Sequence, residues 1–136
     1  LNTALQASDE KLASLESLKW KYRVLMVFAK EPFVATALAN LSELAIEIEE
    51  RELVWFLLAN DELHSNYSGN LGIEVREQLM DRYFTPAPAE TRVFLIGKDG
   101  AVKSRDSGLD LEAIFGLIDQ MPMRRAETRH AGDKLD

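Results

Sequence analysis

The segment RVLMVFAKEPFVATALANL, residues Arg23–Leu41, decides the predicted fold. Residues Val24 to Phe28 are continuously apolar, which indicates a strand that is covered on both faces. Pro32 follows closely, and proline suits the first turn of a helix because its missing N–H is not needed there. We therefore predict a buried strand that runs directly into a helix.

The predicted helix continues toward residue 50 and leads into a second buried strand. Its apolar stripe comprises Val34, Ala37, Leu38, Leu41, Ala45 and Ile48. The run LVWFLL, from Leu53 to Leu58, is again continuously apolar. A strand, a helix and a strand with short joins predict a right-handed βαβ unit with parallel strands.

Periodicity and turn signals predict the remaining elements. They are a helix from Ser8 to about Tyr22, a loop over 59–70, a helix over 71–83, strands over 91–96 and 101–105 joined by the turn GKDG, and a helix that Asp110 caps and Pro122 ends. The sequence thus predicts a single domain over residues 1–136, with its core at about 9–121 and a polar, frayed tail over 122–136.

Composition narrows the function classes. The chain has 136 residues, enough for one domain, and a formal net charge of −7. An acidic protein is repelled by phosphates, so we expect neither nucleic acid nor anionic lipid as a partner. No apolar run approaches the roughly 20 residues of a transmembrane helix. The chain contains no cysteine, which removes disulfides, thiolate nucleophiles and thiolate metal ligands.

Four pieces of the sequence carry a family resemblance: WKYRVLMVFA from Trp20, RELVWFL from Arg51, VFLIGKDGAVKSR from Val93 and IDQMPMRR from Ile118. Together they resemble a thioredoxin-like domain family of unknown function. That family occurs in bacterial exported proteins and in vertebrate extracellular proteins of the sushi-repeat and "down-regulated by oncogenes" types. The resemblance implies an α/β fold with a mixed four-stranded sheet in the order 2-1-3-4 and helices on both faces. It also implies a location outside the cytoplasm, periplasmic or secreted.

The redox site of thioredoxin-like proteins is altered here. Laid on the thioredoxin pattern, the segment places Pro32 and Ala35 at the two cysteine positions. Thr91 stands where the redox families carry a cis-proline. The catalytic residues therefore do not carry over, and we expect no thiol-disulfide oxidoreductase and no thiol peroxidase.

Residues at the old active-site edge are the first binding candidates. Lys30, Glu31 and Pro32 stand at the start of a helix, where free backbone N–H groups and the helix dipole could hold a carboxylate or phosphate. The favoured alternative is that Glu31 caps the helix itself and Lys30 is solvated. Arg92 and Thr91 belong to the same edge, and Arg92, Lys98, Lys103 and Arg105 could present positive charge to an acidic partner. Edge-strand lysines more often prevent strand pairing.

Trp20 and Arg23 form a second candidate site, an aromatic–arginine anchor for a peptide. The favoured alternative is structural: Trp20 covers one end of the core, and Arg23 stacks on it or pairs with a helix acid. A metal site is not expected, because Asp61, Glu62 and His64 supply too few nitrogen ligands in one loop. No cofactor is predicted.

The leading hypothesis is a redox-inactive thioredoxin-like module that binds a protein or a small ligand. The alternative is an enzyme of non-thiol mechanism that uses Lys30, Glu31 or Arg92 at the former active-site edge. A third hypothesis is a structural domain that forms homo-oligomers.

Overall fold

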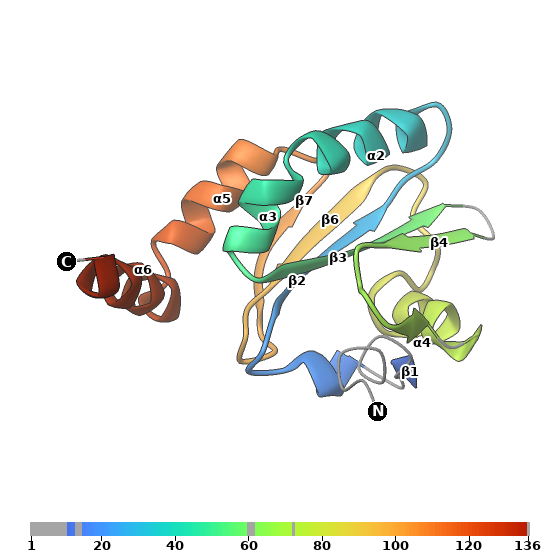
Figure 1. Ribbon diagram of the computed structural model, residues 1–136. Coiled ribbons are helices and arrows are strands. Elements are labelled where there is room, and N and C mark those ends of the chain that lie inside the picture. Colours follow the sequence, from blue (N-terminus) through green and yellow to red (C-terminus); the bar gives the residue numbers. More distant parts are fainter. Residues whose placement is uncertain (1–10, 13–14, 60–61, 72, 136) are drawn as a thin grey trace.

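The computed structural model describes residues 11–12, 15–59, 62–71 and 73–135. A five-stranded sheet lies at the centre, with strands in the order β4-β3-β2-β6-β7 (Figure 1). Strands β2 and β3 are parallel, and the other neighbours are antiparallel. The bounds are β2 Arg23–Phe28, β3 Leu53–Ala59, β4 Glu62–Ser65, β6 Arg92–Ile96 and β7 Val102–Asp106.

The order predicted for four strands is confirmed, because β3-β2-β6-β7 is the order 2-1-3-4. The loop predicted over 59–70 is wrong, however, since it contains β4 and one further short strand, β5 (Asn70–Leu71). Strand β4 pairs with the outer edge of β3, with Phe56 opposite Ser65. Its sequence ELHS is mostly polar and gave no strand signal, which is typical of an edge strand whose residues are exposed or only partly buried.

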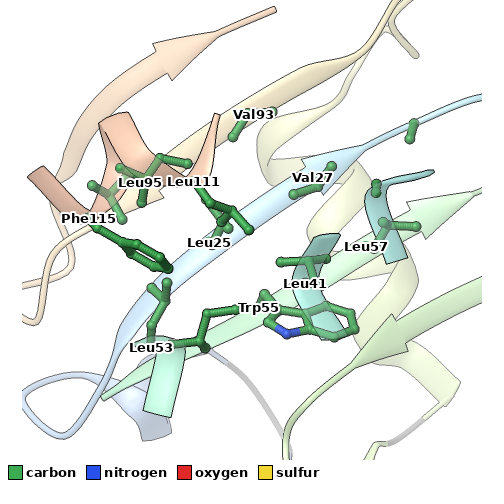
Figure 2. Packing of buried hydrophobic residues seen from close by; sticks show 14 of the residues in the cluster. Leu25, Val27, Leu41, Leu53, Trp55, Leu57, Val93, Leu95, Leu111 and Phe115 are labelled. Atoms are coloured by element: carbon green, nitrogen blue, oxygen red, sulfur yellow. The ribbon is translucent and has the colours of Figure 1, made fainter. Parts of the chain in front are cut away.

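Helices cover both faces of the sheet, as predicted. One face carries α2 (Phe33–Glu43), α3 (Ala45–Glu50) and α5 (Leu111–Asp119), whereas the other carries the 3-10 helix η1 (Leu15–Leu18) and α4 (Ile73–Tyr83). Odd-numbered residues of β2, such as Leu25 and Val27, point to the first face, where α2 and α5 pack on them (Figure 2). The alternate residues pack on the second face. Burial on both faces of the sheet explains why β3 and, apart from Arg23, β2 are apolar throughout.

The helix that follows β2 is interrupted at Leu44, which separates α2 from α3. Within the predicted stripe, Val34, Ala37, Leu41 and Ile48 are buried and Leu38 is partly buried. Ala45 is exposed, because the break turns it away from the core.

The predicted N-terminal helix is wrong in its described part. Lys11–Leu12 form strand β1, which pairs with β5 in parallel, and only Leu15–Leu18 are helical. Ser8, the expected cap, lies outside the described residues. Pairing with a segment almost sixty residues away in the sequence cannot be inferred from local apolar spacing.

The polar tail is also different from the prediction. Residues Pro122–Leu135 form helix α6, so Pro122 begins a helix after the one that ends at Asp119. Ion pairs to the body of the protein, described below, hold this polar helix. None of the described helices is long and apolar enough to cross a membrane.

Candidate functional site

A pocket opens where β2 ends and the chain turns into α2. Its volume is about 550 Å³, and we call it the β2-end pocket. Four segments meet there: the residues after β2, the first turns of α2, the residues before β6, and the loop between β7 and α5. The lining comprises Ala29, Lys30, Glu31, Phe33, Thr36, Ala37, Asn40, Ala89, Glu90, Thr91, Ser107, Gly108 and Leu109.

The structure brings three of the predicted site residues together, since Lys30, Glu31 and Thr91 all line this pocket. Pro32 is the N-cap residue of α2 and is exposed. Arg92 does not line the pocket: it alternates with Val93, which is buried under α2 and α5, so Arg92 points to the opposite face. Its Nη1 donates a hydrogen bond to the carbonyl oxygen of Thr91 at 3.0 Å.

The chemistry of the β2-end pocket suits reversible binding. Its buried floor includes Ala29 and Ala37, and the ring of Phe33 is 62% exposed at the rim. Thr36, Thr91 and Ser107 add hydroxyl groups that can donate or accept hydrogen bonds. Among the described lining residues, Lys30 is the single cation, against the carboxylates of Glu31 and Glu90. This balance favours a neutral or cationic ligand over the anion considered from the sequence.

The start of α2 is held by a local turn. The N–H of Phe33 donates to the carbonyl oxygen of Lys30 at 2.8 Å. Pro32, the N-cap residue, makes no side-chain capping bond.

Trp20 lies at the other end of the sheet, and the prediction that it covers the core is wrong. Its side chain is 61% exposed. The backbone has φ +70°, and the N–H donates to the carbonyl oxygen of Lys98 at 2.6 Å. This left-handed conformation directs the indole away from the core.

Arg23, in contrast, is only 1% exposed, so it cannot serve as a surface anchor. It pairs with a helix acid, one of the two structural alternatives. Its Nη1 and Nη2 lie 3.3 and 3.2 Å from the two carboxylate oxygens of Glu127, in α6. Nη1 also donates to the carbonyl oxygen of Arg51 at 2.9 Å.

Lys98 completes this ionic cluster and is buried, contrary to the expectation of a positively charged hairpin surface. Its Nζ donates to Glu127 at 2.8 Å and to Glu52 at 3.2 Å. Burial alone would raise the pKa of Glu127, but the hydrogen bonds and charges of Lys98 and Arg23 outweigh it and lower that pKa below its usual value. The sequence interpretation missed Glu127 because it treated residues 122–136 as frayed; Pro122 at a helix start was the available signal.

In the acidic segment considered for a metal, the histidine ring instead makes a hydrogen-bond contact with a glutamate. Nε2 of His64 lies 2.9 Å from Oε2 of Glu62. Asp61 lies outside the described residues. Among the described side chains, no three from His, Cys, Asp and Glu gather as metal ligands would.

Residues 14–127 match the family described as "Domain of unknown function (DUF4174)". The chain belongs to this family. This DUF4174 domain has a thioredoxin-like fold, as its likeness to two peroxiredoxin structures shows. Curated proteins gave no match.

The first of these structures is the reduced 2-Cys peroxiredoxin of Plasmodium vivax, with a TM-score of 0.53 and 18% identity over 77% of this chain and 68% of that chain. The second is the mitochondrial 2-Cys peroxiredoxin of Plasmodium falciparum, with a TM-score of 0.51 and 15% identity over 77% and 78%. At such identities the likeness concerns the fold of the DUF4174 domain and not its activity.

Proposed function

We propose that this DUF4174 domain is a redox-inactive binding module, and that the β2-end pocket holds its ligand, a segment of a protein or a small molecule. One observation carries the proposal. The pocket lies at the edge where thioredoxin-like enzymes hold their cysteines, yet Pro32 and Ala35 stand at those positions and the chain has no cysteine.

The dimensions and exposure of the pocket support binding. Small-molecule sites typically have volumes of about 300–1,000 Å³, and the β2-end pocket falls within that range. Its polar rim residues Lys30, Glu31 and Glu90 are exposed, so a ligand can reach them without a conformational opening. An exposed Phe33 offers apolar contact area beside them.

The alternative of a non-thiol enzyme has less support. Of its alternative candidates, Arg92 points to the other face of the sheet, whereas Lys30 and Glu31 line the β2-end pocket. We propose a location outside the cytoplasm, which rests on the family resemblance of the four quoted segments.

Gly108 offers a direct test. An added Cβ would meet no atom within 4 Å at Gly108, which lines the pocket, and the same is true of Gly116 on α5. The Cβ of Gly108→Trp therefore has room, and we expect its indole to cover part of the β2-end pocket without disturbing the fold; Gly116→Trp is the matched control. The measurement is an NMR titration with a set of tripeptides and with small neutral and cationic compounds.

We expect shifts at the residues of the β2-end pocket, an affinity at least tenfold weaker in Gly108→Trp, and unchanged binding in Gly116→Trp. Shifts that centre elsewhere, or equal binding by both variants, would contradict the proposed site.

Redox inactivity has its own measurement. The purified protein should show no turnover above buffer in an insulin-reduction assay with dithiothreitol or in a hydroperoxide-consumption assay, because no thiolate can form. Measurable turnover in either assay would reject this part of the proposal.

A further inference from the structure

Helix α6 is attached to the domain by polar contacts. None of its described side chains, residues 122–129, is fully buried. Arg124 donates to the carbonyl oxygen of Glu50 at 2.8 Å and to Asp119 at 3.4 Å. Glu127 makes the pairs with Arg23 and Lys98. A helix held in this way can be released by a competitor for its ion pairs, because its side chains at residues 122–129 would lose little apolar contact.

The partners of Glu127 form a preorganised receptor for one carboxylate. The guanidinium of Arg23 faces both of its oxygens, and Nζ of Lys98 approaches one of them from another segment. Both cations are more than nine-tenths buried, and a buried cation without a partner is costly. Glu52 is the other acid at Lys98, but its side chain is 47% exposed. Removal of Glu127 would therefore leave the buried positive charges of Arg23 and Lys98 without this carboxylate, and an external anion could replace it.

A cavity of about 270 Å³ lies beside these cations. Its described lining comprises Arg23, Gly97, Lys98, Asp99, Lys103, Met121, Pro122 and Met123. Asp99 pairs with Lys103 at 3.0 Å, which leaves Arg23 and Lys98 as the cations for a ligand. A carboxylic acid with a short apolar chain matches this combination, since its charge can meet the two buried cations while its chain contacts the methionines.

Backbone conformations nearby also indicate a constrained site. The two non-glycine residues with positive φ in the described part of the chain are Trp20 and Glu52. Both contact Lys98, one through its backbone N–H and the other through its carboxylate. Such conformations persist where surrounding contacts determine them.

We propose that Arg23 and Lys98 form a carboxylate-binding site, which Glu127 occupies as an internal ligand. An external carboxylate with a short apolar chain replaces Glu127 and releases α6. This site lies at the opposite end of the sheet from the β2-end pocket, so it stands independently of the function proposed above.

The test uses the full chain with Glu127→Ala, which empties the carboxylate position. The probe is butyrate, compared with sodium chloride at equal ionic strength and with butyramide as a neutral analogue. Glu112→Ala, which removes an exposed carboxylate from α5, is the matched control.

We expect butyrate to raise the thermal midpoint of Glu127→Ala with saturation, by about 5 °C at ten times its dissociation constant. Butyramide should have no such effect, and Glu112→Ala, in which Glu127 still occupies the site, should need butyrate concentrations at least tenfold higher for the same rise. Adding Lys98→Met to Glu127→Ala should weaken the response at least tenfold. A midpoint that changes equally in butyrate, chloride and butyramide would overturn the proposal.

The unmodified chain supplies the deciding measurement if Glu127→Ala does not fold. Saturating butyrate should then accelerate amide hydrogen exchange in α6 at least fivefold over chloride of equal ionic strength, while β2 and β3 stay protected. Unchanged exchange in α6 would equally overturn the proposal.

Discussion

At the scale of single residues, Trp20 and Glu52 carry the most unusual conformations of the described chain. Both have positive φ, +70° and +50°, a region that disfavours side chains with a Cβ. They flank the start of β2, where the N–H of Arg23 donates to the carbonyl oxygen of Glu52 at 2.9 Å. The two residues thus position Arg23 and Lys98, which bind Glu127.

Trp20→Gly and Trp20→Ala together measure the conformational cost. The indole is mostly exposed, so both variants lose similar and small side-chain contacts. Glycine alone removes the steric penalty of positive φ, and we expect Trp20→Gly to be more stable than Trp20→Ala by about 1 kcal/mol. Urea unfolding followed by circular dichroism provides the measurement. Equal stability, or a more stable alanine variant, would show that the backbone is relaxed at this position.

At the scale of elements, Asn66 completes the edge of β3 beyond the end of β4. Its Nδ2 donates to the carbonyl oxygen of Leu53 at 3.1 Å, and its Oδ1 accepts from the N–H of Trp55 at 2.8 Å. The side-chain amide of Asn66 thus bonds to the edge of β3 as the backbone of one residue in a neighbouring strand would. Two backbone groups at the sheet edge are satisfied in this way.

Asn66→Ala should destabilise the fold by about 2 kcal/mol, because both backbone groups lose their partner. Hydrogen exchange of the Trp55 amide should become faster, whereas the Phe56–Ser65 pairing should remain. Asn66→Asp keeps an acceptor for Trp55 and loses the donor to Leu53, so its effect should be intermediate. An alanine variant with unchanged exchange at Trp55 would contradict this role of Asn66.

Elements with an apolar run, a helical periodicity or a turn signal were predictable from the sequence, and polar elements without such a signal were not. Strand β3 and, apart from Arg23, strand β2 are apolar throughout because they are buried on both faces, and α4 shows clear helical spacing. Strand β4 is mostly polar and pairs with the preceding strand β3, whereas strand β1 and helix α6 form through contacts with distant segments. The local spacing of apolar residues does not indicate such contacts.

The same distinction applies to the candidate sites. Lys30, Glu31 and Thr91 could be placed together because the fold pattern assigns them to one edge. Ser107 and Gly108 reach that edge only because α5 packs on the sheet. Glu127 reaches Arg23 only because α6 lies at the end of the sheet where β2 begins.

At the scale of the whole molecule, acid should weaken the ionic attachment of α6. The pKa of Glu127 is lowered in the folded protein, and Arg51, by hydrogen bonding, lowers that of Asp119 as well. A lowered pKa means that folding favours the ionised form. This contribution to stability is present above the ordinary pKa and is lost as the pH falls through the lowered one.

Glu127→Gln should therefore be less stable than the unmodified chain at pH 7, by about 2 kcal/mol, and this difference should shrink as the pH falls below about 4.5. Urea unfolding at pH values from 7 to 3 measures it. Glu112→Gln, on the exposed side of α5, should show no comparable pH-dependent difference. A difference for Glu127→Gln that stays constant across this range would contradict the role assigned to the carboxylate charge.

The position of α6 has a practical consequence for capturing an interaction partner. This helix leaves the domain at the end of the sheet where β2 begins, and the β2-end pocket opens at the end where β2 finishes (Figure 1). An affinity handle fused after α6 would immobilise the molecule on beads with the pocket directed toward the surrounding extract.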